Sequence, residues 1–301
     1  MIYIFSRNYI YNNIEDDIQS ILYSFNLLNI EYTFILCDDL DTNLDTNIIE
    51  IIYNENKLNY FIFFQTDSYT HLDKNIHKDI IKRSFIVNIE QLSPPGVIDS
   101  IKEYSIKEYI MKGYGIIDYN EENINIINRN INIDNNRIFF IPYQVNPNEL
   151  LNIKKENDIC TINPNSQNRN CIVNFSKEII NINIVEGFGL SRDQQLFNNK
   201  ALLNIHYHDT AKIFEDIRCD RLIFNKMFII SEKSIDTSIN NDIKEFILEF
   251  NTQKELEIIL NNIKENFDMV YDTIFKNFNL ESIQKGRLEY VNKFKNELFN
   301  L

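Results

Sequence analysis

In the second half of this chain two apolar runs flank a segment whose polar residues gather in a loop and along one side of an expected helix. The runs are Ala201 to His206 and Met227 to Ser231, and uninterrupted apolar residues are typical of strands covered on both faces. The segment between them has the apolar spacing of a helix and carries Lys212 and Arg218. A strand that leads into a helix N-terminus binds phosphates in α/β proteins, because free amides and the helix dipole favour anions. We therefore predict an anion site on the amides of Thr210 to Phe214.

The first half of the chain alternates apolar runs with longer amphipathic stretches. This alternation predicts a parallel sheet with helices on both faces. The predicted strands are Ile2–Phe5, Tyr32–Cys37, Tyr60–Phe64, Ser84–Asn88, Gly115–Asp118 and Arg137–Ile141. The predicted helices are Ile14–Leu28, Thr46–Asn54, Lys74–Lys82, Pro95–Lys112 and Glu121–Arg129.

The second half repeats the pattern after a polar segment with two prolines, Pro142–Asp158, which is typical of a linker between domains. Its predicted strands are Ile159–Ile162, Ile179–Val185, the two runs above and Glu245–Phe250, with a helix at Thr252–Phe267. The tail Met269–Leu301 has helical spacing throughout. Such a helix gains most of its stability from packing, so the tail needs a surface to bury its apolar side.

Composition limits the function. A chain of 301 residues predicts two domains, and a net charge of −14 argues against general nucleic-acid binding, which needs a basic surface. The four cysteines form no CxxC pair, so neither a zinc site nor a disulfide framework is indicated. No window reaches the roughly 18 apolar residues of a membrane span. We expect a cytoplasmic protein without a transmembrane segment.

Three short motifs in the second half carry a resemblance to a known group of proteins. A strand ending in N-I-H-Y, a helix with F-E-x-x-R and a strand ending in S-E resemble the donor-binding segment of small GT-B glycosyltransferases of bacteria and large DNA viruses. The matching residues are Asn204, His206, Tyr207, Phe214, Glu215, Arg218, Ser231 and Glu232. Weaker similarities are NIEQL from Asn88, DYN from Asp118 and GFGLSRD from Gly187.

The resemblance implies an α/β fold of two Rossmann-like domains facing across a cleft, with C-terminal crossover helices. Residues 1–145 would form the acceptor domain and residues 146–268 the domain for the nucleotide-sugar donor. Residues 269–301 would form helices that pack back on the first domain. The implied partners are a nucleotide sugar, most simply a UDP-sugar, and a glycan or other hydroxyl acceptor.

The same resemblance implies which residues bind the donor. They are Ser166, Arg169, Arg192, His206, Lys212, Glu215, Arg218 and Asp220. Retaining relatives place two glutamates eight residues apart across this helix; here the corresponding residues are Lys212 and Asp220, and Asp220 is the candidate for the ribose. The loop before Ser166 and Arg169 lacks the glycine that lets backbone approach a phosphate closely.

Each of these residues also has an ordinary structural interpretation. Arg218 fits a solvated helix surface, Asp220 an ion pair along the helix, and Arg192 a plain turn. His206 fits a buried histidine with its hydrogen bonds satisfied, and because His208 points to the opposite side of the strand, the two are poorly placed to share a metal.

Sugar transfer by inversion needs a base to take the proton of the acceptor hydroxyl. Glu90 is the candidate, because it follows the apolar strand SFIVN at the carboxyl edge of the first predicted sheet; Asp118 is a weaker one. We expect no metal ion and no cofactor, since GT-B enzymes as a class bind their donors without a divalent metal. The nearest acidic cluster is DDLD at Asp38–Asp41.

The sequence also bears on two other function classes. A catalytically inactive GT-B-like module that binds a nucleotide or a partner is favoured by Lys212 and by the missing glycines. A dinucleotide-dependent oxidoreductase is disfavoured, because no G-x-G-x-x-G follows any predicted strand.

Overall fold

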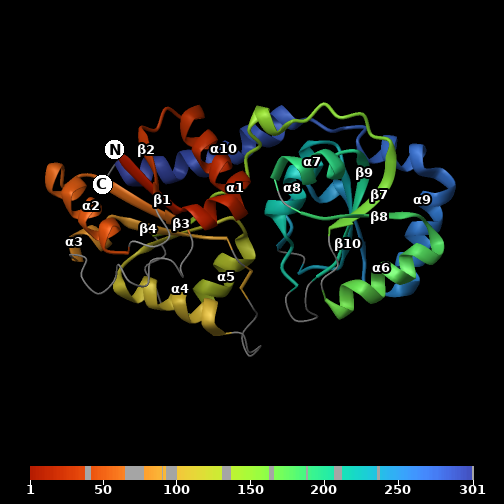
Figure 1. Ribbon diagram of the computed structural model, residues 1–301, viewed down its shortest axis with the longest axis horizontal. Helices are drawn as coiled ribbons and strands as arrows, with labels where there is room; N and C mark the ends of the chain where they lie inside the picture. Colours follow the sequence, from red (N-terminus) through yellow and green to blue (C-terminus); the bar gives the residue numbers. More distant parts are fainter. Residues whose placement is uncertain are drawn as a thin grey trace. The chain divides into compact units, whose positions relative to one another are not determined.

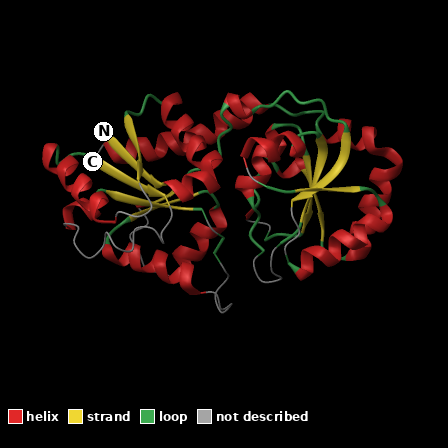
Figure 2. Cartoon of the chain, viewed as in Figure 1, coloured by secondary structure: helices red, strands yellow, loops and turns green. Residues whose placement is uncertain are grey.

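The computed structural model describes residues 1–301 except 38–41, 65–77, 90, 93–99, 131–136, 163–165, 188, 207–211, 236–237 and 300–301. The chain divides into two compact units. Unit 1 comprises Met1–Gln144 and Lys285–Leu301, and unit 2 comprises Val145–Gln284. Each unit is a parallel sheet with helices on both faces (Figures 1 and 2), which is the predicted α/β class.

Unit 1 contains a six-stranded sheet in the order β2-β1-β3-β4-β5-β6, and all its strand pairs are parallel. The strands are β1 Ile2–Arg7, β2 Tyr32–Cys37, β3 Tyr60–Phe64, β4 Ser84–Asn88, β5 Gly115–Asp118 and β6 Ile138–Phe140. The helices that follow them in sequence are α1 Asn8–Leu27, α2 Thr42–Glu55, α3 Lys78–Ile81, α4 Ser100–Lys112 and α5 Glu121–Asn130. A side chain at Gly115 would collide with the ring of Phe85, so β5 needs glycine at its first position.

The last helix of the chain, α10 at Leu280–Phe299, belongs mostly to unit 1. Its Phe294 is fully buried, with its ring 6.0 Å from that of Phe25, 5.5 Å from Phe85 and 4.9 Å from Phe139. Aromatic side chains bury large apolar areas. The C-terminal segment is therefore part of the core of the N-terminal unit.

Unit 2 contains a five-stranded parallel sheet in the order β11-β10-β9-β7-β8. The strands are β7 Asn157–Ile162, β8 Ile182–Val185, β9 Asn199–Asn204, β10 Phe228–Glu232 and β11 Ile247–Phe250. The helices are α6 Gln167–Ile179, α7 Gly189–Leu196, α8 Asp216–Phe224 and α9 Gln253–Ile274. A capping box fixes the start of α9: the Thr252 hydroxyl accepts from the Glu255 amide, and the Glu255 carboxylate accepts from the Thr252 amide.

The tail from Met269 onward contains the end of α9 and the whole of α10, as the expectation of C-terminal helices requires. Helix α9 ends at Ile274, and the next helix begins at Leu280. Between them Phe275 and Phe278 each place their rings 5.4 Å from that of Phe246, which keeps this segment in unit 2. The tail joins unit 1 from Lys285 onward, later than the expected residue 269.

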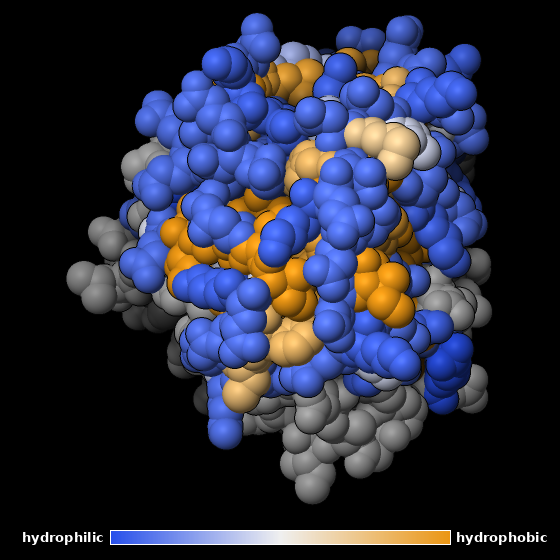
Figure 3. All heavy atoms as spheres, turned by 90° about the vertical axis from the view of Figure 1, so that its right-hand side faces the viewer, coloured by the Kyte–Doolittle hydropathy of each residue, from blue (hydrophilic) through white to orange (hydrophobic). Residues whose placement is uncertain are grey.

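Unit 2 retains apolar surface around α9. Figure 3 views the molecule from the side that carries α9 in Figure 1, and orange apolar side chains lie there between polar ones. Exposed apolar side chains of α9 include Ile258 and Met269, each more than half exposed. Helix α9 buries its opposite face, with Leu256, Leu260 and Ile263 in the core.

Candidate functional site

The carboxyl edge of the unit 2 sheet brings together residues from four elements. Strand β7 leads to α6, whose N-cap Ser166 accepts a hydrogen bond from the Arg169 amide at 3.3 Å. The Arg169 guanidinium crosses to the end of β9, where its Nε donates to the Ile205 carbonyl at 2.8 Å. A short hydrogen bond therefore helps to hold Arg169 at the edge of the sheet.

Glu215 lies between two guanidinium groups at the start of α8. Its Oε1 lies 3.5 Å from Arg169 Nη2, and its Oε2 contacts Arg218 Nη1. The side chains of Glu215 and Arg169 are 17% and 11% exposed, whereas that of Arg218 is 35% exposed. Arg218 is therefore the cation of this group that a dissolved anion reaches most directly.

His206 follows β9 and is almost fully buried. Its amide donates to Glu232 Oε2 at 3.1 Å, and its Nε2 lies 3.1 Å from Ser234 Oγ. Burial lowers the pKa of His206; the charges of Glu232 and Glu215 act to raise it, and that of Lys212 lowers it further. The net direction is downward, so the imidazole is neutral at physiological pH.

The structure corrects the predicted start of the central helix. Helix α8 begins at Asp216, with Glu215 as its N-cap, and not between Thr210 and Phe214. The Phe214 amide donates to Ser238 Oγ at 3.0 Å, and the Phe214 side chain is fully buried. Burial of an apolar side chain and capture of this amide by Ser238 thus delay the helix, and the Phe214 amide is not available to a phosphate.

Asp220 is fully buried within α8, so it is not the surface residue that helical spacing alone indicated. Six consecutive residues from Cys219 to Phe224 are buried, because α8 is covered on more than one side. The carboxylate of Asp220 therefore presents no accessible oxygen to a ribose in this structure.

Arg192 makes its contacts in a separate group of charges on α7 and α8. Its Nε and Nη2 bond Asp193 Oδ1 at 3.1 and 2.9 Å, and Arg221 bonds both oxygens of Asp193 at 3.0 and 2.7 Å. Burial raises the pKa of Asp193, but its hydrogen bond to Arg221 and the charges of Arg221 and Arg192 outweigh burial and lower it. This group ties two helices together.

The remaining candidates lie in unit 1 or outside the described part of the chain. Glu90 and the DDLD segment at residues 38–41 are outside the described residues. Asp118 is fully buried at the end of β5, where it accepts hydrogen bonds from Asn88, Asn120 and Asn123 at 2.7 to 3.0 Å. Burial raises the pKa of Asp118 to about 7 although these hydrogen bonds lower it.

Sequence reasoning missed Ser234 and Ser238 and gave Glu232 no role beyond its place in a motif. All three lie at or just after the carboxyl end of β10, the neighbour of β9 in the sheet. Ligands of parallel sheets bind where strands end, and this rule points to these three residues when it is applied to the end of β10 as well as to that of β9. Within the described residues, no group of three or more His, Cys, Asp or Glu side chains is arranged to hold a metal ion.

Comparison with known proteins shows the fold. A glycosyltransferase from Rickettsia africae covers 99% of this chain and 98% of its own at 11% identity, with a TM-score of 0.54. Anabaena HepE, solved with UDP and glucose, covers 97% of this chain and 99% of its own at 7% identity, with a TM-score of 0.58. A UDP-N-acetylglucosamine 2-epimerase covers 100% and 96% at 7% identity, with a TM-score of 0.56. The predicted GT-B fold is confirmed, and these low identities show the fold alone.

Relatives in sequence include uncharacterized proteins of Acanthamoeba polyphaga mimivirus. L140 is 30% identical over 60% of this chain, and R358 is 25% identical over 88% of this chain and 90% of its own length. The chain spans 63%, 32% and 24% of the lengths of L140, L137 and L138. No model of a known protein family matches the chain. No described helix combines the length and the apolar character needed to span a bilayer.

Proposed function

We propose that this protein is a hexosyltransferase that moves a sugar from a nucleotide-sugar donor, a UDP-sugar, to a hydroxyl acceptor without a metal ion. The observation that carries the proposal is the group formed by Arg169, Glu215, Arg218 and His206 at the carboxyl edge of the unit 2 sheet. In parallel α/β sheets, ligands bind at this edge. HepE shares the fold and was solved with UDP and glucose.

The proposed roles follow from exposure and charge. Arg218 would bind the diphosphate, with Lys212 adding positive charge, because Arg218 is the more exposed of the two arginines. Arg169 would hold Glu215, whose carboxylate pairs with Arg218 until a diphosphate replaces it. Fixed cations that stabilise the charge developing on a leaving diphosphate lower the barrier to transfer. Glu90 stays the candidate base for the acceptor hydroxyl.

A catalytically inactive nucleotide-binding module is the second candidate, and the same group of charges favours it. Glu215 already contacts both guanidinium groups, and a lysine stands at the position where retaining relatives carry an acid. An enzyme and a binding module would both bind UDP, but only the enzyme would release UDP from UDP-glucose in the presence of an acceptor or water.

The test is calorimetric titration of the full chain with UDP and UDP-glucose, followed by an assay for released UDP. We expect Arg218→Ala to weaken UDP binding about 10- to 150-fold, the value of a lost hydrogen bond to a charged group, without unfolding the protein. Arg129→Ala is the matched control, because Arg129 is 61% exposed and also pairs with a glutamate, Glu122, but lies in unit 1.

Three results would contradict the proposal in different ways. Absence of UDP binding at millimolar concentration would show that the chain has no donor site for UDP. Full affinity for UDP in folded Arg218→Ala would show that Arg218 does not bind the diphosphate. Turnover that EDTA abolishes and manganese restores would contradict the metal-independent route and return attention to Asp38, Asp39 and Asp41.

A further inference from the structure

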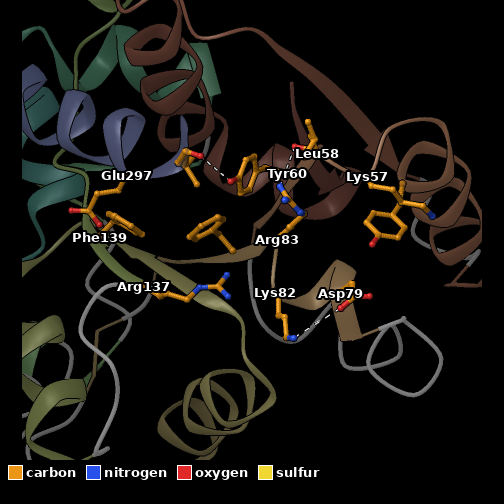
Figure 4. A pocket seen from close by; sticks show the side chains of 12 residues that line it. Lys57, Leu58, Tyr60, Asp79, Lys82, Arg83, Arg137, Phe139 and Glu297 are labelled. Atoms are coloured by element: carbon orange, nitrogen blue, oxygen red, sulfur yellow. Dashed lines mark hydrogen bonds and ion pairs between the residues drawn. The ribbon is translucent and has the colours of Figure 1, made fainter. Parts of the chain in front are cut away.

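Unit 1 contains a cavity of about 480 Å³ at the amino ends of its strands (Figure 4). Tyr60 is the first residue of β3, Arg83 directly precedes β4, and Arg137 directly precedes β6. The C-terminal part of α10 closes the cavity through Glu297 and Leu298. The cavity therefore lies at the sheet edge opposite to Asp118, and all its lining residues belong to unit 1.

Two guanidinium groups line this cavity in fixed positions. Arg83 lies 5.1 Å from the ring centroid of Tyr60 and donates to the Leu58 carbonyl at 3.3 Å. Arg137 lies 5.3 Å from the ring centroid of Phe85 and donates to the Ser84 carbonyl at 3.2 Å. Each guanidinium has five N–H donors, so one backbone carbonyl leaves most of them for another partner.

The described residues supply no carboxylate to either guanidinium at ion-pair distance, although two acids line the cavity. Asp79 lies 4.0 Å from Lys82, and Glu297 completes the wall near Phe139. Lys57 and Lys82 add to the two arginines, so four basic side chains face two acidic ones. This local excess of positive charge is opposite in sign to the net charge of the chain, which is −14.

The environment of Arg137 makes its charge costly. Burial lowers the pKa of Arg137, which shows that the guanidinium has lost part of its hydration. A partly desolvated cation is stabilised by an anion that replaces the lost water. Arginine binds phosphate through paired N–H donors, whereas lysine acts as a point charge.

The size of the cavity restricts the ligand further. Pockets for small organic molecules range from about 300 to 1,000 Å³, and this cavity falls within that range. An inorganic phosphate would leave most of it empty. The rings of Phe85 and Phe139 and the side chain of Leu298 provide apolar wall for the rest of a larger molecule.

We propose that this cavity is a second ligand site of the protein, specific for a small organic molecule that carries a phosphate group. The phosphate binds between Arg83 and Arg137, and the organic part lies against the aromatic wall. The proposal does not depend on sugar transfer, because it uses none of the residues of unit 2.

The test uses phenyl phosphate, inorganic phosphate and benzyl alcohol as probes, titrated calorimetrically into the full chain. We expect phenyl phosphate to bind more tightly than inorganic phosphate, and benzyl alcohol to show no binding at the same concentration. The double variant Arg83→Gln/Arg137→Gln should lose about tenfold or more in affinity for phenyl phosphate. Arg137→Lys keeps the charge but not the paired donors, and should show an intermediate loss.

Controls separate this site from the one in unit 2. Lys293→Gln, at an exposed position of α10, and Arg218→Ala should both leave phenyl phosphate binding unchanged. If the double variant melts at a lower temperature, Lys57→Gln replaces it, because Lys57 is exposed and its loss should weaken binding a few-fold without unfolding. Undetectable binding of phenyl phosphate at millimolar concentration, or unchanged affinity in a folded double variant, would overturn the proposal.

Discussion

The two sheets both carry polar groups at the carboxyl ends of their strands, but the groups differ in kind. In unit 1 the fully buried carboxyl of Asp118 accepts hydrogen bonds from the side-chain amides of Asn88 and Asn123 and from a backbone amide. In unit 2 the carboxylate of Glu215 contacts two arginines, one of them 35% exposed. The carboxyl edge of the sheet therefore holds a fully buried group around Asp118 in unit 1, which we call the sealed group. In unit 2 it holds a partly exposed group around Glu215, which we call the open group.

This difference separates a group enclosed in the core from a group whose charges a dissolved ion can reach. Amide donors around one buried carboxyl are already satisfied and connect the loops that follow β4 and β5. Charge pairs near the surface contribute little to stability and can exchange partners with a ligand. The carboxyl edge of a parallel sheet thus predicts where polar residues gather. Their residue type and exposure decide whether they are already satisfied within the protein or can exchange partners with a ligand.

The largest expected effect is on the stability of unit 1. Asp118→Ala removes the acceptor of buried donors that include those on Asn88, Asn120 and Asn123, and each buried donor left unsatisfied costs about 1 to 3 kcal/mol. We expect a loss of about 3 kcal/mol or more, against about 1 kcal/mol or less for Glu215→Ala, whose partners can turn to water. Urea unfolding combined with hydrogen exchange reads each unit separately. Equal losses in the two variants would show that the two groups have the same character.

The next effect is the pH dependence that Asp118 confers. Its pKa is about 7 in the folded state and 3.8 in its ordinary environment. The folded chain therefore keeps a proton that the unfolded chain releases between these values, and stability falls as pH rises through this window by at most about 1.4 kcal/mol per pH unit. Asp118→Asn lacks this dependence, so its stability relative to wild type should rise from pH 5 to pH 7. A stability difference between Asp118→Asn and wild type that stays constant from pH 5 to pH 7 would contradict a raised pKa of Asp118.

Sequence alone predicted most of the fold, for a simple reason. Buried strands such as Tyr60–Phe64 and Ser84–Asn88 are short apolar runs between polar residues, and both were predicted to the residue. The predicted start of α8 was wrong, because Ile213 and Phe214 have helical spacing but lie in the core ahead of the first helical residue, Asp216. Their place depends on Ser238, a long-range contact that no local pattern contains.

The candidate site was predictable in position but not in its pairings. The resemblance to small GT-B glycosyltransferases pointed to Ser166, Arg169, His206 and Glu215, and the structure places all four at the carboxyl edge of the unit 2 sheet. The sequence could not show that Arg169 pairs with Glu215, or that Arg192 belongs with Arg221 through Asp193. Ion pairs between distant segments depend on how the sheet brings those segments together.

A smaller effect concerns His206 in unit 2. Because burial lowers its pKa, the folded chain binds this proton less readily than the unfolded chain. The stabilisation is complete above the ordinary pKa of 6.5 and is lost as pH falls through the lower folded value. His206→Gln should therefore gain stability relative to wild type as pH falls from 7 to 5, opposite in sign to the Asp118 effect. Hydrogen exchange of β9 measures it, and a parallel pH profile for both proteins would argue against a buried neutral histidine.

The smallest expected effect tests whether the open group exchanges its partners. Glu215→Gln removes the charge that now neutralises Arg169 and Arg218 but keeps an oxygen that accepts from Arg169. If Glu215 competes with a ligand for these cations, pyrophosphate should bind about two- to fivefold more tightly, the value of an exposed ion pair of about 0.5 to 1 kcal/mol. Asp118→Asn is the matched change in the sealed group and should leave pyrophosphate affinity unaltered. Weaker binding in Glu215→Gln would mean that Glu215 itself contacts the ligand or fixes Arg218 for it, and that its negative charge belongs to the binding site.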